Sequence, residues 1–521
     1  MSAATRERAG DVSFSLTVSG HGSETFQVVS FSGEEALNDN YLFTISLVSS
    51  REDLRPDDFF GKEATFTLTS RREGAPVSVA YHGVVGLFRV SHQILPRTFY
   101  EVTLVPGLSR LDLSVYSEVY TVEKGIPGLL EEVLKEAGFT SRDYQFRTGD
   151  SYRPRSFVCQ YRESPGQFLA RWAEREGIVT YFDHEGEKER IVFYDQPHQK
   201  PAWKRTLVYR PPGDPDIGFS DDSLHGWSET RHPVPEKVVV SDYNYRKAAL
   251  EIREEVAVPG GGSRGIFALY GENLRTNAEA KRQATLLSEM IRCRERLFSG
   301  QATATGIRAG TTVRVTRHFR SEMEGDFFVI RVRHEGSLAG TTPGGGDGGE
   351  SHYQNFFEAI PADRPFRPER RTPWPRIEGV VEAQVEAEGS GRFAELNEYG
   401  EYKLRFYFAL TRKKSQKGSG WVRLATPLAG SDNGMHFPLR KGTEVAVAFW
   451  GGGPRPAGHR GGASQLGGPE PDFEPESGKE HDPLRRGALP HAERRKPLER
   501  PGPNNPDLTE EAQNVGTFRN Q

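Results

Sequence analysis

The histidine–glutamate pairs offer the most obvious chemistry in this sequence, because two histidines and a glutamate can hold and serve a catalytic zinc ion. His184–Glu185 and His334–Glu335 each supply one such pair. A His-Glu-x-x-His helix needs a second histidine four residues after the first, and Lys188 and Leu338 stand there instead. We therefore expect both pairs to lie in turns or at strand ends.

Other catalytic motifs are also missing from the sequence. It contains no phosphate-binding P-loop and no Cys-x-x-Cys pair. Glu131 and Glu132 are adjacent acids, but the helical pattern around them predicts the solvent face of a helix. Cys159 and Cys293 are the only cysteines, which indicates buried apolar positions and folding in a reducing compartment. We expect no enzyme, no cofactor, and no catalytic, cofactor-binding or metal-binding residue.

The composition narrows the range of partners. The 521 residues carry a formal net charge of -4, and the mean hydropathy is -0.63. This balance favours neither nucleic acid nor an anionic membrane surface as a partner. The first residues lack the apolar run of a secretory signal, and no stretch is long enough for a membrane span. The 56 glycines and 34 prolines are typical of a loop-rich β protein.

Alternating apolar and polar residues dominate the first hundred positions. Such alternation predicts half-buried strands, and its density predicts a barrel or a sandwich. The apolar positions are Phe14, Leu16, Val18, Tyr41, Phe43, Ile45, Leu47, Phe66, Leu68, Val84, Leu87, Tyr100, Val102 and Leu104.

The pattern then changes to helical periodicity. Apolar residues on one face predict a helix that begins near Pro127 and ends at Gly138, and a second helix that ends at Gly177. Two aromatic-rich runs around His184–Lys188 predict a hairpin. Residues 200 to 330 return to strands, interrupted by a long helix from Thr276 to Arg296.

A small barrel is predicted between Pro373 and Trp450, where about five strands suit an OB-fold. Its strand Tyr402–Phe408 is basic and aromatic, so one interpretation is the stacking of single-stranded nucleic acid. One buried and one solvated face of a barrel strand is the better interpretation, because several acids would repel phosphates. These acids are Glu378, Glu382, Glu386 and Glu388.

Six segments in a fixed order resemble the VgrG family, the spike proteins of type VI secretion systems, which are similar to the hub and spike proteins of contractile phage tails. The most specific segment is FVCQYRESPGQFLARWAEREGIVTYFDHE, Phe157–Glu185. The resemblance runs from Val12 to Trp450. It departs at Glu401, where the family commonly has arginine after Tyr-Gly. The other segments are Phe26–Ser49, His82–Val90, Tyr100–Val115, Tyr353–Pro368 and Asn397–Phe408.

The resemblance implies a mechanical function. In this family a homotrimer forms a ring from two β-barrels per chain, with an α+β region packed against them. The ring meets the end of a hexameric tube (Hcp) among baseplate proteins. Three copies of two similar barrels give six units, which can match a six-fold ring. An OB-fold and a β-helix needle follow, capped by a PAAR-repeat tip protein, and the assembly carries effectors. The protein would be cytoplasmic during assembly and then injected by the apparatus.

The sequence after Trp450 departs from the family, which continues into a Pro-Asp-Arg-Pro-Val-Ile loop and the needle. Here the chain reads GGGPRPAGHRGG. Codons for Pro454 to Arg460, read one nucleotide later, can encode that loop. We hypothesise that translation leaves the ancestral frame between Trp450 and Pro454. The tail is then polar and proline-rich, and we expect it to be disordered. Without a needle, we expect the trimer to be weakened.

These observations predict a mainly β fold with an α+β portion. The expected parts are a disordered N-terminus (1–11), a first hub barrel (12–120), an α+β region (121–200), a second hub barrel with a long helix (201–370), an OB-fold (371–453) and a disordered, frame-shifted tail (454–521). Two alternatives to the type VI spike stay open. One is the hub of a prophage tail or another contractile injector, and the other is a lytic enzyme on a tail scaffold.

Overall fold

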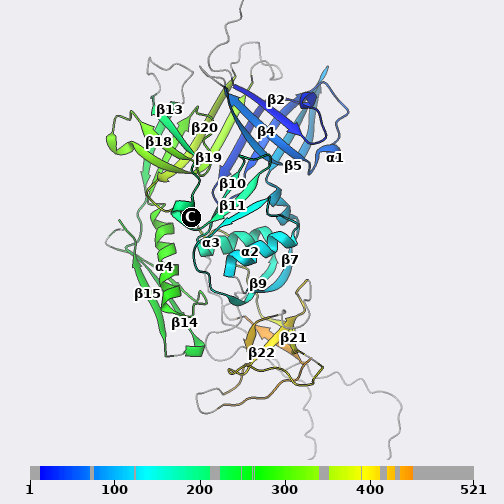
Figure 1. The fold of residues 1–521 in the computed structure, drawn as a ribbon, viewed down its shortest axis with the longest axis vertical. Coiled ribbons are helices and arrows are strands. Elements are labelled where there is room, and N and C mark those ends of the chain that lie inside the picture. Colours follow the sequence, from blue (N-terminus) through cyan, green and yellow to red (C-terminus); the bar gives the residue numbers. More distant parts are fainter. Residues whose placement is uncertain are drawn as a thin grey trace, which may run out of the picture. The chain divides into compact units, whose positions relative to one another are not determined.

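The computed structural model describes residues 12–70, 76–122, 125–211, 223–247, 249–260, 262, 264–338, 351–388, 390–410, 419–428 and 434–449 (Figure 1). All of them belong to the first of two compact units, Met1–Gly468. The predicted N-terminal segment 1–11, the tail 454–521 and the frame break after Trp450 lie outside the described residues. Strands predominate, which confirms the mainly β fold with an α+β portion.

The first barrel arises from the alternating segments of the N-terminal part. Its neighbouring strands follow the order β1-β4-β5-β6-β3-β2 within a 12-stranded sheet. Every second residue of β1, from Phe14 to Val18, is buried, as the alternation predicted. The core between the strands is rich in aromatic rings. The strands are β1 (Val12–Val18), β2 (Gln27–Ala36), β3 (Leu42–Ser49), β4 (Glu63–Ser70), β5 (Val77–Ile94) and β6 (Arg97–Val105), with the short α1 (Pro56–Phe59) before β4.

The second barrel continues the same sheet in the order β19-β18-β12-β13-β17-β20, and an additional β19–β20 pairing closes it. Its core is a separate apolar cluster around Trp227, Phe298 and Val332. The strands are β12 (Lys204–Tyr209), β13 (Ser223–Arg231), β17 (Arg296–Ala302), β18 (Thr312–Thr316), β19 (Gly325–Ser337) and β20 (His352–Pro361).

One long strand, β19, joins the two barrels. Its first part pairs with β18, from Gly325 to Phe328. Its second part, Arg331–Ser337, pairs antiparallel with β2 of the first barrel. The joint between the barrels is therefore a continuous backbone ladder.

An α+β region follows the first barrel in the sequence. Its helices α2 (Gly125–Glu136) and α3 (Pro165–Glu176) pack against each other and bury apolar side chains, as their periodicity predicted. Gly177 ends α3 in the left-handed conformation, with φ 69°. The hairpin β10 (Val179–Asp183) and β11 (Arg190–Tyr194) confirms the prediction around His184–Lys188. The other strands are β7 (Tyr116–Val122), β8 (Tyr144–Arg147) and β9 (Arg155–Glu163).

A helix-on-sheet unit is inserted into the second barrel. Helix α4 (Asn277–Arg292) is the predicted long helix, and it packs on the strands β14 and β15 (Figure 1). Thr276 caps its first turn by accepting a hydrogen bond from the Glu279 amide. The three-stranded sheet comprises β14 (Lys237–Tyr243), β15 (Glu251–Ala257) and β16 (Ile266–Tyr270).

The described part of the OB region contains a four-stranded sheet, one strand fewer than we predicted, together with an isolated bridge between Phe393 and Arg440. Tyr402, Leu404 and Phe406 of β22 are buried, which confirms one buried strand face. The strands are β21 (Val380–Glu386), β22 (Glu401–Phe406), β23 (Trp421–Arg423) and β24 (Glu444–Ala448).

Candidate functional site

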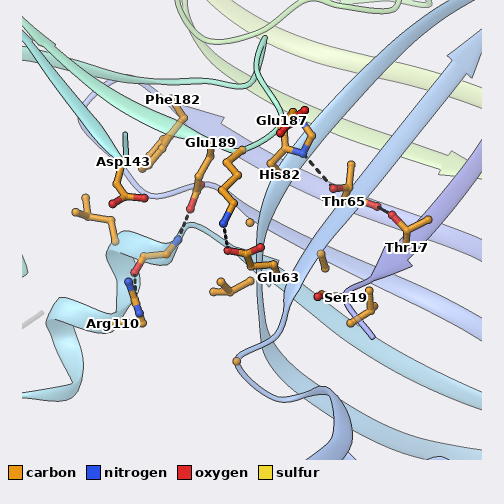
Figure 2. Close-up of a pocket in the computed structure, with 18 of the residues that line it drawn as sticks. Thr17, Ser19, Glu63, Thr65, His82, Arg110, Asp143, Phe182, Glu187 and Glu189 are labelled. Atoms are coloured by element: carbon orange, nitrogen blue, oxygen red, sulfur yellow. Dashed lines mark hydrogen bonds and ion pairs between the residues drawn. The ribbon is translucent and has the colours of Figure 1, made fainter. Parts of the chain in front are cut away.

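A cavity of about 510 Å³ lies between the first barrel and the turn of the β10–β11 hairpin (Figure 2). Strands β1, β4 and β5 supply one wall, and residues Glu187–Glu189 of the turn supply another. The sequence had pointed to none of the lining side chains as a functional residue, although Val18 and Val84 had been predicted as strand residues and Lys188 as part of the turn. The residues that bear chemistry are His21, Glu63, His82, Arg110, Asp143, Glu187, Lys188 and Glu189.

Glu189 is the central carboxylate of this cavity. The Tyr41 hydroxyl and the Gly107 amide donate hydrogen bonds to its two oxygens. Burial raises the pKa of Glu189 to about 7, against the opposing effect of these two donors. Gly83 makes the approach of Tyr41 possible, because a Cβ atom there would lie 2.5 Å from the tyrosine hydroxyl.

The rim of the cavity is held by contacts between the barrel and the turn. Lys188 of the turn forms an ion pair with Glu63 of β4. The His82 ring lies 3.0 Å from the Thr65 hydroxyl, and Figure 2 shows both side chains on the barrel wall. Burial, followed by Arg308, lowers the pKa of His82. The turn is thus fastened to the barrel at several points.

The two histidines singled out from the sequence both lie close to Tyr81 of β5. The rings of His184 and His334 lie 5.4 and 5.8 Å from the ring of Tyr81. His184 accepts a hydrogen bond from the His82 amide at 3.1 Å. Burial, Arg308 and His82 keep its pKa well below the ordinary value. His184 therefore lies in a turn as predicted, but as a buried residue.

His334 does not end a strand, which corrects the prediction for this residue. It lies inside β19, where Glu35 and the Tyr353 hydroxyl hold its two ring nitrogens at 3.1 and 2.9 Å. Alternation in β19 points this side chain into the joint between the barrels. The adjacent Glu335 pairs with Arg333 at 2.6 Å. Neither histidine of the two pairs lines the cavity.

The other residues that the sequence analysis named lie at the kinds of position that it predicted. Cys159 and Cys293 are free and buried, and burial raises the pKa of both thiols. Glu131 pairs with Lys135 one turn along α2, and Glu132 is exposed, as predicted for a solvent face. In the part of the chain that the structure describes, no group of three or more metal-ligating side chains is assembled. Nor does any helix described there have the length and apolar character needed to cross a membrane.

The chemistry of the cavity is limited by the partners of its acids. A general acid or base must reach a substrate proton with a free lone pair or proton. Both oxygens of Glu189 are engaged by Tyr41 and Gly107, and Glu63 is engaged by Lys188. What this arrangement does is join the hairpin turn to the first barrel.

A second polar cluster, which we call the ionic junction, surrounds helix α3. Arg171 and Arg175 are each 1% exposed. The Arg171 guanidinium donates to both carboxylate oxygens of Glu163, at 2.6 and 2.8 Å. Arg175 donates to Glu176 and Glu272 at 2.8 and 3.1 Å. Arg171 thus ties α3 to β9 within the α+β region, whereas Arg175 ties α3 to Glu272, which follows β16.

Glu176 receives the densest set of cations in the ionic junction. Burial opposes its ionisation, but Arg175, Arg155 and Arg282 hold its pKa at about 2. Arg282 comes from α4, so this carboxylate ties α3 to the helix-on-sheet unit. Alternating arginine and glutamate in the α3 sequence was the available signal, but it did not identify the partners.

Glu401, the one departure from the family pattern, also has a structural partner. Its side chain is fully buried and accepts hydrogen bonds from Arg246 and Asn397, both at 2.6 Å. Arg246 comes from the turn after β14, so the pair links the OB region to the helix-on-sheet unit.

Comparisons with known proteins agree with this architecture. A family model described as the phage tail baseplate hub (GPD) matches residues 34–340. A model described as the type VI secretion system/phage-baseplate injector OB domain matches residues 399–462. The second match extends past the position where we hypothesised a break in the reading frame.

Curated relatives include spike proteins. The chain is 26% identical over 444 residues to the type VI secretion system spike protein VgrG1b of Pseudomonas aeruginosa, covering 83% of this chain and 58% of that protein. It is 26% identical over 465 residues to the actin cross-linking toxin VgrG1 of Vibrio cholerae, covering 85% and 41%. The chain therefore spans about half the length of these relatives.

Solved structures share the fold. One is an Escherichia coli component of the type VI secretion system, described as similar to the T4 bacteriophage tail proteins gp27 and gp5. It matches with a TM-score of 0.60 and 20% identity over 84% of this chain and 97% of that one. The Francisella PdpA–VgrG complex in its lidded form matches with a TM-score of 0.53 and 9% identity over 84% and 69%. Because the hub model covers more than half of the sequence, this chain belongs to the phage tail baseplate hub family.

Proposed function

We propose that this chain is the hub and OB part of a type VI secretion spike, which docks on the end of the tube and delivers effectors by mechanical puncture. The observation that carries the proposal is the order of the two family matches, a hub followed by an injector OB domain. The joined barrels support it, because a continuous ladder transmits force through backbone hydrogen bonds.

The proposed partners follow from this function. They are two further copies of the chain, the tube protein, baseplate proteins, a PAAR tip protein and effectors. The Francisella VgrG is found in a complex with PdpA, which supports a protein cargo. We propose that the chain is cytoplasmic during assembly and is then injected by the apparatus. No binding of nucleic acid and no membrane span is part of this proposal.

We assign no catalysis to this chain. One relative is named an actin cross-linking toxin, but this chain covers 41% of that protein. Two of the cavity acids, Glu189 and Glu63, are engaged in hydrogen bonds and an ion pair within the fold, which supports a structural function. Incubation with purified peptidoglycan tests the lytic alternative, and we expect no released fragments.

The domain division is also part of the proposal. We place the first barrel at 12–120, the α+β region at 121–200, the second barrel at 201–370 and the OB-fold at 371–453. Segments 1–11 and 454–521 would lie outside these bodies. Limited proteolysis with mass analysis tests the division, and cleavage inside a proposed domain before its boundaries would contradict it.

A phage tail hub is the second candidate, and the description of the matching hub family favours it. The experiment that separates the two is a pull-down with purified tube rings. We expect the chain to bind hexameric rings of the type VI tube protein and to restore secretion in a strain that lacks its spike gene. Binding only to a phage tail tube, with no rescue of secretion, would replace the type VI assignment by the phage hub.

A further inference from the structure

The two barrels repeat one strand order. In the first barrel the neighbours run β1-β4-β5-β6-β3-β2, and in the second they run β12-β18-β19-β20-β17-β13. Strands at the same place in the two orders are counterparts, so that β5 corresponds to β19 and β2 corresponds to β13. From the second strand onward, every neighbouring pair is antiparallel in both barrels. The first strands differ, because β1 is antiparallel to β4 and β12 is parallel to β18.

The correspondence extends to single residues. Pairing of β5 with β6 shifts between Val85 and Leu87, and pairing of β19 with β20 shifts between Val329 and Arg331. Just before each shift the backbone contacts also match. Val85 bonds to Gly61 and Lys62, whereas Val329 bonds to Gly310 and Thr311. Leu87 of β5 therefore corresponds to Arg331 of β19.

Strand β19 has two partners along one edge, β18 for its first part and β2 for its second. Strand β5 has the same first partner, since Val77–Val84 pairs with β4. Its second part, Leu87–Ile94, pairs with β6 on one edge. Within the described residues, the other edge of Leu87–Ile94 carries no ladder. This is the edge that β2 occupies on β19.

The counterpart of β2 is β13. Strand β13 also has an edge that is only partly paired. Its residues Gly226–Arg231 pair with β17 on one edge. On the other edge β12 pairs with Ser223 and Leu224, and the described residues provide no ladder beyond them. The chain thus carries two such edges, one on β5, the counterpart of β19, and one on β13, the counterpart of β2. Together they could form a second joint like the β19–β2 joint.

We propose that β5 of one copy pairs with β13 of the next copy, as β19 pairs with β2 inside the chain. The contact joins two different surfaces, so the copies associate head to tail, and three such contacts close the copies into a ring. This inference rests on the proposed trimeric hub, in which three copies would supply six barrels. Unpaired strand edges recruit other strands in solution, and the exposed apolar residues of this edge fit a covered position. They are Leu87, Val90 and Ile94, at 37%, 49% and 50% exposure.

The internal joint also predicts the register. Inside the chain Arg333 lies opposite Glu34. Arg89 is the counterpart of Arg333, two residues past the shift. The pairing of β2 with β3 shifts just before Ser30, and the pairing of β13 with β17 shifts just before Gly226. Glu34 and Thr230 each lie four residues past that point, so Thr230 is the counterpart of Glu34. Arg89 of one copy should therefore lie opposite Thr230 of the next.

Engineered disulfides test this register in the full chain. Directly opposite residues of an antiparallel pair have Cα atoms about 4.5–5.5 Å apart, which is within the range of about 4.4–6.8 Å that a disulfide spans. We expect an oxidised Arg89→Cys/Thr230→Cys variant to give covalent dimers and trimers and nothing larger. The control is Arg89→Cys/Ser228→Cys, shifted by two residues, which should give about tenfold less product. The native Cys159 and Cys293 are buried and should not interfere.

Mixing single variants tests the direction of the contact. Arg89→Cys chains mixed with Thr230→Cys chains should cross-link, and neither should cross-link alone. Self-linking of Arg89→Cys alone would overturn the inference, because it would show a two-fold contact between β5 strands. An amine-reactive cross-linker applied to wild type separates this inference from the proposed function. Trimers captured by that reagent without the predicted disulfide would overturn the strand pairing alone, and capture of neither would overturn the trimeric hub as well.

Discussion

The first barrel and the ionic junction are both buried, but opposite kinds of side chain hold them together. The barrel core consists of packed apolar and aromatic residues such as Phe43 and Phe66, both at 0% exposure. The junction around α3 consists of arginines and glutamates, and Arg171 is as well buried as those rings. Apolar cores tolerate swaps of similar volume, whereas a buried charge requires its one partner. The comparison therefore predicts different responses to substitution.

Loss of one charge from the ionic junction should have the largest effect. Arg171→Met leaves Glu163 buried without its cation, which should cost about 3–5 kcal/mol of unfolding free energy. Urea denaturation followed by tryptophan fluorescence measures the change. The control is the double variant Arg171→Met/Glu163→Leu, which removes both charges and should regain most of the stability. Equal instability of the single and double variants would show that the pair contributes through packing alone.

A cavity in the first barrel should cost somewhat less. Leu104 is fully buried, and Leu104→Ala removes apolar contacts without exposing a charge. The expected loss is about 3 kcal/mol. This loss should be the same at low and high salt, because no ion pair is involved. A strong salt dependence would contradict the apolar character that we assign to this core.

The barrel could be predicted from the sequence and the ionic junction could not, for a physical reason. Alternation is local, so Phe14, Leu16 and Val18 indicate a strand face whatever they pack against. Arg175 pairs with Glu272 and Arg246 pairs with Glu401, across 97 and 155 residues of sequence. Only the folded chain brings such residues together. Glu401 illustrates the point, since the sequence shows it only as a departure from the family pattern, and its partner Arg246 lies 155 residues away.

The cavity, like the ionic junction, could not be predicted from local sequence patterns. The hairpin turn around His184 was predicted from its aromatic flanks. That this turn lies against the first barrel, with Glu189 bound to Tyr41, depends on contacts 148 residues apart in sequence. The repeated strand order of the barrels was hidden for another reason. It is a property of backbone pairing, and similar pairing can be reached by unrelated side chains.

The pH dependence of the unfolding free energy should reveal the burial of Glu189 in the hairpin turn. Burial raises the pKa of Glu189 from its ordinary 4.5 to about 7. Its protonated form therefore stabilises the fold fully below pH 4.5, and this contribution is lost as the pH rises through about 7. Wild type should lose about 1–2 kcal/mol more than Glu189→Gln between about pH 5 and pH 8, since the side chain is half-buried.

The difference between wild type and Glu189→Gln separates the contribution of Glu189 to the pH dependence from the contribution of His184. The pKa of His184 is lowered, so its contribution has the opposite sign and is lost as the pH falls. It is present in both proteins and cancels. Glu187→Gln, exposed in the same turn, should keep the wild-type profile. A profile for Glu189→Gln that parallels wild type would show that the carboxylate is not held as we describe.

The smallest effect should come from an ion pair with almost the same geometry as Arg171–Glu163. Arg314 of β18 donates to both oxygens of Asp326 at 2.7 Å. These side chains are 63% and 37% exposed, against 0% and 7% for Arg171 and Glu163. Water and salt screen an exposed pair, so Arg314→Ala should leave the urea midpoint unchanged. If Arg314→Ala destabilised the protein as much as Arg171→Met, bidentate geometry would matter more than burial. Hydrogen-bond geometry, and not burial of charge, would then explain why the ionic junction responds differently to substitution from the barrel.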